Sequence, residues 1–184
     1  MIYFHQWFRT QYPIESNHYD EKLGNISNTI MLWLKEYNSI EERTGLYLAT
    51  SNAGVFESVS FWENALIHSP GFANPANFNW TLSNGPASLL SRKLQIRGPC
   101  YTLIGSSEAI EGCLYHASED LKAGMITTAL VSGLDIYNEE LHFSTCLLSA
   151  LPGKYILELK SIRSLENQEK YASSFLNKIL NLLS

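Results

Sequence analysis

Short apolar runs alternate with stretches of helical periodicity along most of this 184-residue chain. A run such as Thr44–Thr50 is typical of a strand that is buried on both faces of a parallel sheet. We expect five strands, over Ile2–Phe8, Thr44–Thr50, Pro99–Gly105, Thr127–Ser132 and Lys154–Ser161. Strands that alternate with helices favour an α/β fold, in which right-handed crossovers build a mostly parallel mixed sheet with flanking helices.

The expected helices lie in the segments between these strands, where apolar residues recur every three or four positions. They run from about Ile26 to Tyr37 and over Glu57–His68, Pro86–Leu94, Glu108–Lys122 and Glu166–Leu183, with loops over Arg9–Asn17 and Ser69–Asn79. The sequence shows no internal repeat and no low-complexity linker. Residues 1–184 are therefore expected to form one domain.

Charge and hydropathy exclude two classes of partner. The chain has 13 Lys and Arg residues, a net charge of -5 and no basic run, which argues against nucleic acid. No apolar run reaches the roughly 18–20 residues that a membrane-spanning helix needs. Charged residues make up only 17% of the chain, so either a partner protein covers part of the surface or Tyr and Asn replace charge there.

The N-terminus and the cysteines indicate a cytoplasmic protein. Met1–Arg9 lacks the basic segment followed by an apolar one that marks a signal peptide. Cys100, Cys113 and Cys146 are odd in number and lack C-x-x-C spacing, as expected of reduced thiols. No cluster of His, Cys, Asp and Glu has the spacing of metal ligands, so no metal and no other cofactor is expected.

The segment from Asn84 to Asp135 carries the most specific motifs. Ile96–Pro99 reads I-R-G-P, and Ser107 follows the glycine of this motif by nine residues, in a turn between a strand and a helix. The helix ends at Gly124, and the next strand leads into Gly133–Asp135, which reads G-L-D. The order and spacing of these motifs resemble the nucleophile region of a β-ketoacyl synthase, a condensing enzyme of the thiolase fold.

Three further segments fit this resemblance. Asn74–Phe78 stands where the family carries S-P-x-x-F, Asn52–Gly54 where it has a glycine-rich turn, and Pro152–Glu158 where it has its fifth strand. The chain resembles the β-ketoacyl synthase-like N-terminal domain family, short proteins of aryl polyene-type polyketide gene clusters. The resemblance implies that residues 1–184 form a single truncated ketosynthase-like domain, the N-terminal half of the thiolase fold.

The resemblance also implies that this chain lacks condensing activity. Ser107 stands at the position of the family's catalytic cysteine, and a serine hydroxyl needs an adjacent base to become a nucleophile. Its neighbour Glu108 suits the N-terminus of a helix but adds negative charge where an oxyanion would form. None of the five histidines lies in the family's H-G-T or N-x-F-G-F-G-G-x-N segments, before which the sequence ends. We therefore expect a pseudo-ketosynthase subunit with no catalytic residue.

The family's dimer indicates which residues would meet a partner. In condensing enzymes the strand equivalent to Pro99–Gly105 pairs antiparallel across a two-fold axis, and an apolar edge strand needs such a partner. The expected interface residues are Pro99, Cys100, Tyr101, Thr102, Leu103 and Ile104. In the family the preceding loop shapes the partner's acyl pocket, which assigns that role to Asn77, Phe78 and Trp80. Phe78 and Trp80 are equally well explained as core aromatics.

The resemblance implies an auxiliary subunit. It would form a heterodimer with an active ketosynthase of aryl polyene, polyketide or fatty acid-type biosynthesis. It would stabilise this enzyme and shape its acyl pocket, as chain-length factors do in type II polyketide synthesis. An acyl carrier protein is a further expected partner, through the complex. Pairing of the chain with itself stays open.

The helix expected after position 107 supports this interpretation. Ala109, Ile110, Cys113, Leu114 and Ala117 form one apolar face, whereas Glu108, Glu111, Ser118 and Glu119 mark a polar one. A helix sandwiched between two sheets, as in a complete condensing enzyme, would be apolar nearly all round. An amphipathic helix instead faces water on one side.

Two alternative functions compete with the auxiliary subunit. Gly105–Ala109 partly resembles the G-x-S-x-G elbow of α/β-hydrolases, and Asp135 and His142 follow in the order of a triad, which would make the chain a serine hydrolase-like acyl esterase that uses Ser107. His142 lies only seven residues after Asp135, however, which is close for two separate loops. The other alternative is a carrier-protein-binding scaffold, for which Arg92, Lys93 and Arg97 form a modest basic patch.

Overall fold

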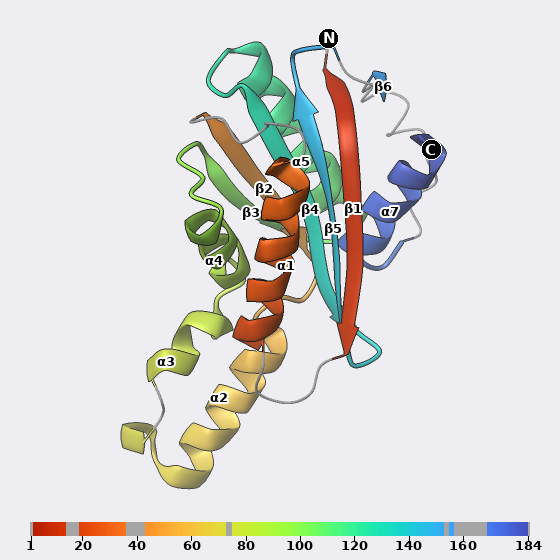
Figure 1. The fold of residues 1–184 in the computed structure, drawn as a ribbon. Helices are drawn as coiled ribbons and strands as arrows, with labels where there is room; N and C mark the ends of the chain where they lie inside the picture. The colour runs from red at the N-terminus through yellow and green to blue at the C-terminus, as the bar shows by residue number, and fades with distance from the viewer. Residues whose placement is uncertain are drawn as a thin grey trace.

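The computed structural model describes residues 2–13, 19–35, 43–72, 75–152, 155–156 and 169–183. These residues form a six-stranded sheet with helices on both faces and a helical arm that projects beyond the sheet (Figure 1). The strands are β1 (Tyr3–Pro13), β2 (Thr44–Thr50), β3 (Cys100–Ile104), β4 (Thr128–Tyr137), β5 (Glu140–Ser149) and β6 (Tyr155–Ile156). Their order across the sheet is β3-β2-β4-β5-β1-β6, so that β3 lies at an edge.

The helices divide into two layers and the arm. The described elements are α1 (Tyr19–Lys35), α2 (Val55–His68), η1 (Pro70–Phe72), α3 (Pro75–Phe78), η2 (Asn79–Thr81), α4 (Gly85–Lys93), α5 (Ser107–Lys122) and α7 (Ala172–Leu183). α1 and α4 cover one face of the sheet, and α5 and α7 cover the other. α2, η1, α3 and η2 pack mainly against one another and form the arm.

The sheet confirms the expected α/β class, but it has six strands rather than five. β2 is parallel to β3 and β4, whereas β5 is antiparallel to β4 and β1, and β6 is antiparallel to β1. Among the strands that the structure describes, parallel pairing thus joins β3, β2 and β4, and "mostly parallel" was wrong for the other half of the sheet. The strand Glu140–Ser149 was not predicted.

The missed strand follows a turn without a glycine signal. Asn138 and Glu139 connect β4 to β5 with φ angles of 52° and 59°. The type I′ two-residue hairpin turn needs positive φ at both positions, and Asn-Gly is the usual sequence for it. Because Glu139 stands where glycine is usual, the local sequence carries little sign that the chain reverses there.

Several strands and helices begin or end at other residues than the sequence predicted. Residues 9–13, expected in a loop, continue β1 because they pair with β5 as far as Pro13 opposite Glu140. α1 begins at Tyr19, earlier than expected, and α7 begins only at Ala172. Of the expected strand Lys154–Ser161, the structure describes Tyr155–Ile156; the other residues, like residues 166–168 of the last expected helix, lie outside the described ranges.

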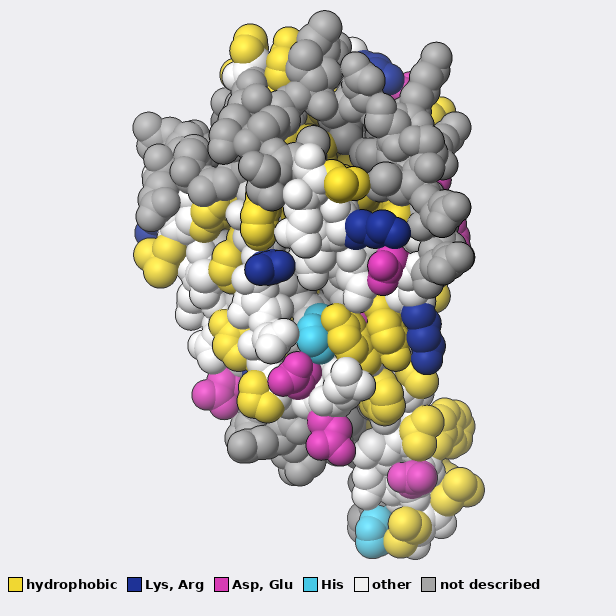
Figure 2. All heavy atoms as spheres, turned by 90° about the vertical axis from the view of Figure 1, so that its right-hand side faces the viewer, with side chains coloured by type: hydrophobic (Ala, Val, Ile, Leu, Met, Phe, Trp, Pro, Cys, Tyr) yellow, Lys and Arg dark blue, Asp and Glu magenta, His cyan; other side chains and the backbone are white. Residues whose placement is uncertain are grey.

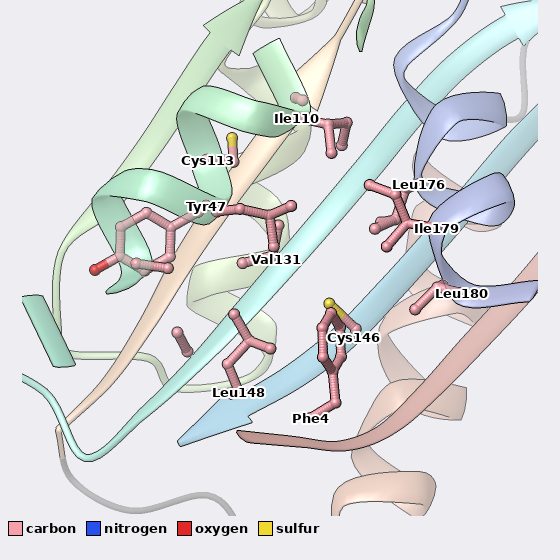
Figure 3. Packing of buried hydrophobic residues seen from close by; sticks show 14 of the residues in the cluster. Phe4, Tyr47, Ile110, Cys113, Val131, Cys146, Leu148, Leu176, Ile179 and Leu180 are labelled. Carbon is pink, nitrogen blue, oxygen red and sulfur yellow. The ribbon is translucent and has the colours of Figure 1, made fainter. Parts of the chain in front are cut away.

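The sheet has an apolar core on each face. On one side Tyr47, Val131 and Cys146 of the strands pack against Ile110 of α5 and Leu176 of α7 (Figure 3). On the other side the strands pack against α1 and α4, through a cluster that includes Ile26, Ile30, Leu48, Leu90 and Phe143. Burial on both faces explains why β2 and β4 read as continuous apolar runs.

Candidate functional site

The turn between β3 and α5 places Ser107 at the N-terminus of a helix. Gly105 leaves β3 with a φ angle of 152°, a conformation that side chains rarely allow. Its N–H donates to the carbonyl of Thr50 at 2.9 Å, and its carbonyl accepts from Ser51 Oγ at 3.1 Å. Ser106 then leads into α5, whose first residue, Ser107, is 4% exposed. The strand-turn-helix geometry expected here is therefore present.

The R-G-P motif fixes where β3 begins. The N–H of Gly98 donates to the carbonyl of Thr44 at 3.1 Å, and the carbonyl of Pro99 accepts from the N–H of Leu46 at 2.8 Å. A Cβ atom at Gly98 would lie 2.4 Å from the Thr44 carbonyl oxygen. Only glycine therefore fits this position, which sets the register of β3 and the place of Ser107.

The hydroxyl of Ser107 faces a carboxylate rather than a neutral base. Ser107 Oγ donates to Glu108 Oε2 at 3.3 Å, and Ser106 Oγ donates to the same oxygen at 2.8 Å. The backbone N–H of Glu108 and the hydroxyl of Ser106 lower the pKa of the Glu108 carboxyl. A carboxylate with a lowered pKa is a weak base, and its charge opposes an oxyanion at the same helix terminus.

The triad of the hydrolase alternative is not assembled by the contacts in this structure. Asp135 and His142 are neighbours across the β4–β5 hairpin, but both Asp135 carboxylate oxygens accept backbone N–H groups, from Ser51 and Ser173, at 2.6 Å each. The His142 ring stacks on Tyr137 with centroids 3.5 Å apart, and its Nε2 lies 3.4 Å from Glu140 Oε2. Burial lowers the pKa of His142. The contacts found for these two side chains thus go to other residues, and Ser107 Oγ bonds to Glu108.

An anchoring network that the sequence analysis missed holds the ends of β2, β3 and β4 together. Ser51 Oγ donates to the carbonyl of Gly105 and accepts the N–H of Ala172 at 3.1 Å, so it links the Ser107 turn to the start of α7. The Asn52 side chain donates to the carbonyl of Ile136 and accepts the N–H of the same residue at 2.9 Å. Small polar residues directly after a buried strand were the available signal.

The expected interface strand β3 is open at one side of the sheet and carries exposed apolar side chains. Tyr101 is 46% exposed and Ile104 is 70% exposed. The Tyr101 ring stacks on Tyr47 at 5.6 Å and on His116 at 5.8 Å, between centroids. Tyr47 in turn donates to Asp120 Oδ2 at 2.6 Å, and burial together with this bond raises the pKa of Tyr47. The exposed tyrosine is therefore rigidly supported.

The other residues of the expected interface differ in accessibility. Cys100 is exposed, with Sγ 3.9 Å from the carbonyl of Ala87, and burial of the thiol raises its pKa. Thr102 and Pro99 are half-buried. Leu103 is half-buried and packs against the core on the α5 side.

Solved structures share part of this fold. The ishigamide ketosynthase/chain length factor has a TM-score of 0.57 and 14% identity, over 64% of this chain and 39% of that one. The ketosynthase ApeO in complex with its chain length factor ApeC from Xenorhabdus doucetiae has a TM-score of 0.55 and 17% identity, over 67% and 39%. A β-ketoacyl synthase from Burkholderia phymatum STM815 has a TM-score of 0.52 and 12% identity, over 69% and 40%.

The chain has a ketosynthase-like fold. It spans about two fifths of the length of each of these three proteins, 39–40%. No protein-family model and no curated protein sequence matches it. The resemblance to ketosynthases and chain-length factors expected from the motifs is thus confirmed at the level of the fold.

The ketosynthase-like fold places the expected pocket-shaping residues on the arm. Asn77 is exposed and Phe78 is 51% exposed, so neither is a core residue. Trp80 is half-buried and packs against the core under α1 and α4, as the alternative explanation proposed. Asn77 and Phe78 therefore remain candidates for contact with a partner, whereas Trp80 mainly supports the arm.

α5 shows the expected two faces. Ala109, Ile110, Cys113, Leu114 and Ala117 are buried against the sheet and α7. Glu108 and Glu119 are exposed and Glu111 is half-buried, but Ser118, expected on the polar face, is buried. Arg92, Lys93 and Arg97 are all exposed, at the end of α4 and just after it.

The described residues were also compared with the requirements of a membrane-spanning helix and of a metal site. None of the helices found there is both long and apolar enough to cross a bilayer. Among the same residues, no three His, Cys, Asp or Glu side chains gather as metal ligands would.

Proposed function

We propose that this chain is a non-catalytic, ketosynthase-like subunit that pairs with an active β-ketoacyl synthase. The observation that carries the proposal is the environment of Ser107. Where the resemblance puts a nucleophilic cysteine, a buried serine donates its hydroxyl to the Glu108 carboxylate. Attack by a serine requires a base that removes its proton, and a carboxylate held in its charged form by a helix N-terminus serves poorly. The chain therefore contributes structure rather than chemistry.

The edge strand β3 supports the pairing. An edge strand offers unpaired backbone groups, which natural proteins cover or protect to avoid aggregation. β3 presents the half-exposed Tyr101 and the exposed Ile104 beside those groups, and neither residue carries a charge. Tyrosine is enriched among the residues that dominate binding energy at protein interfaces. Two of the similar structures contain a ketosynthase with a chain length factor, which fits a partner of the same fold.

The arm suggests what the subunit does inside the complex. Asn77 and Phe78 project from it and would reach the acyl pocket of the partner, as the resemblance implies. The chain would then limit or shape the acyl chain made by the ketosynthase in aryl polyene or related polyketide or fatty acid-type synthesis. An acidic acyl carrier protein would meet the complex near the exposed Arg92, Lys93 and Arg97.

The test separates partnership from chemistry. A tagged form of this chain is co-expressed with each ketosynthase encoded next to its gene, and condensation of a carrier-bound acyl chain is measured on the purified complex. We expect a complex whose activity survives Ser107→Ala in this chain and is abolished when the ketosynthase's own cysteine is replaced. Loss of condensation in the Ser107→Ala complex, with the complex intact, would overturn the non-catalytic role.

The esterase alternative has a separate readout. A fluorophosphonate probe labels only activated serines, and the contacts of Ser107, Asp135 and His142 predict no labelling. Stoichiometric labelling that disappears in Ser107→Ala would instead establish a nucleophilic serine. That result would replace the auxiliary-subunit proposal with the hydrolase.

A further inference from the structure

The arm formed by α2, η1, α3 and η2 exposes an unusual amount of apolar surface. Figure 1 shows it projecting below the sheet, and Figure 2 shows hydrophobic side chains gathered over it. Of the residues of α2, only Ala65 is buried. The exposed large apolar side chains of the arm are Val55, Phe56, Val59, Trp62, Leu66, Ile67 and Phe78, and Leu82 follows directly.

Four of these residues form one stripe along α2. Val55, Val59, Trp62 and Leu66 are spaced by four, three and four residues and are 52%, 53%, 63% and 81% exposed. Residues at this spacing lie above one another on a single face of a helix. The same spacing carries the contact seam when two helices pack side by side. The stripe is therefore shaped to receive another helix.

α2 and the Phe78 segment are packed together as one unit, through α2 residues beside the stripe. The rings of Phe61 in α2 and Phe78 in α3 lie 6.0 Å apart between centroids. Ser58 Oγ donates to the carbonyl of Thr81 at 3.1 Å. A Cβ atom at Gly54 would lie 2.8 Å from that carbonyl oxygen, so the start of α2 lies directly against η2. A partner that covers Phe78 would therefore lie close to α2.

The exposed area is large enough for a stable interface. The eight apolar side chains on and beside the arm are 44–81% exposed. Side chains of this size offer roughly 150–250 Å² each, so together they expose on the order of 800 Å². The largest apolar patch on a typical monomer is about 300–600 Å², whereas a standard interface buries about 800 Å² on each partner. The summed apolar exposure of the arm is therefore on the scale of one side of a standard interface.

Charge narrows the identity of the occupant. Residues 45–91 contain no Lys or Arg, and their acidic residues are Glu57 and Glu63. Anionic lipid headgroups, nucleic acid and an acidic carrier protein all need cations that this surface does not offer. An uncharged, apolar helix of another protein subunit fits the surface instead.

We infer that the stripe Val55, Val59, Trp62 and Leu66 docks a helix of the active ketosynthase subunit. This inference rests on the proposed function and adds a second contact area to it, so that the partner is held both at the β3 edge and along α2. Trp62 is the expected anchor of the second area, because a large aromatic side chain that becomes fully desolvated dominates such contacts.

The test uses exposed positions, so that folding is retained. Val59→Lys and Leu66→Lys place a charge in the stripe, and Asn64→Lys places the same charge on the opposite side of α2. Each variant of the 184-residue chain is titrated with the purified ketosynthase that co-purifies with the natural sequence. We expect Kd to rise at least about 10-fold for each stripe variant and to stay within about 3-fold for the control, because a buried, unpaired lysine strongly opposes binding. Circular dichroism checks that α2 is retained.

The three outcomes lead to different conclusions. Weakened binding in the stripe variants alone supports the inference. Natural affinity in the stripe variants, together with lost binding in Ile104→Lys on β3, overturns the inference and leaves the proposed function standing. If no ketosynthase binds the natural sequence, the proposed function fails, and the docking surface fails with it.

Discussion

Ser107 Oγ donates a hydrogen bond to Glu108 Oε2 at 3.3 Å, at the first turn of α5. The two residues occupy the end of a strand-turn-helix unit that Gly98 and Gly105 position. A nucleophile at this place would gain from the positive end of the helix dipole, but the carboxylate takes up that advantage itself. The strand-turn-helix geometry that the resemblance implied is thus present, and a serine bonded to a carboxylate stands at its helix start.

The Glu108 carboxylate is expected to stabilise the helix start only while it is charged. Its pKa is lowered in the folded state, so its contribution is complete above the unfolded pKa of about 4.3 and is lost as the pH falls through the lower folded value. Because Glu108 is exposed, Glu108→Gln should cost less than about 1 kcal/mol at pH 7. Urea unfolding of the natural sequence and the variant measures the cost of the substitution at pH 7 and at pH 3. A cost that stays the same at pH 3 would contradict this account.

Asp135 should matter for stability rather than for catalysis. It is fully buried and accepts charge-assisted hydrogen bonds from the N–H groups of Ser51 and Ser173. Asp135→Asn turns an amide NH2 toward one of these donors and should lower the free energy of unfolding by about 2–3 kcal/mol. Urea unfolding checks the value. A loss of less than about 0.5 kcal/mol, below that of an ordinary hydrogen bond, would show that the network does not hold α7 to the sheet.

The close approach of α7 to β4 gives a steric prediction. A Cβ atom at Gly133 would lie 2.7 Å from Cα of Ser173, so Gly133→Ala must displace the helix and should destabilise the protein by about 1–3 kcal/mol. Gly24 is the matched control. It lies inside α1, where a Cβ atom would meet no neighbouring residue within 4 Å, so Gly24→Ala should stabilise by about 0.5–1 kcal/mol. Thermal unfolding of both variants tests this, and equal effects would contradict the packing of α7.

We expect alkaline pH to destabilise the protein, because buried thiol and phenol groups keep their protons in the folded state and lose them more easily in the unfolded state. Burial raises the pKa of Cys113 to about 12, and it also raises the pKa values of Cys146 and Tyr47. Each group holds its proton more tightly in the folded state. Its contribution to the free energy of unfolding is therefore complete below its unfolded-state pKa, about 8.5 for Cys and 10 for Tyr, and falls as the pH rises above that value. We expect a loss of up to about 1.4 kcal/mol per pH unit for each thiol above about pH 8.5.

Cysteine variants measure that effect directly. Cys113→Ala should flatten the fall in the free energy of unfolding between about pH 8.5 and 10, whatever it costs at neutral pH. Urea titrations at several pH values give the slope. A slope that is the same in the natural sequence and in the variant would contradict a protonated, buried thiol at this position.

The sequence predicted those parts of the fold whose signals are local. The apolar runs of β2, β3 and β4 and the I-R-G-P motif located the parallel strands and the Ser107 turn, because β2 and β4 are buried on both faces and Gly98 has no steric alternative. The β4–β5 hairpin was missed, since Asn138 and Glu139 adopt positive φ angles without a glycine.

The candidate site likewise has features that were predicted and features that depend on residues distant along the chain. Exposure of Tyr101 and Ile104 follows from the edge position of β3, which the resemblance implied. The roles of Ser51 and Asp135 could not be predicted, because their partners lie at the start of α7, far along the chain. The helix that carries the α2 stripe was predicted from the sequence. Only the structure shows that the side chains of the stripe are exposed and do not belong to the core.

The most direct test of the auxiliary-subunit account is the mass of the complex with its ketosynthase, measured by size exclusion with light scattering. The account predicts a one-to-one complex in which this chain contributes 20.8 kDa, and dissociation of that complex by Tyr101→Lys or Ile104→Lys on β3. A well-behaved lone monomer of this chain that binds no ketosynthase would contradict the account.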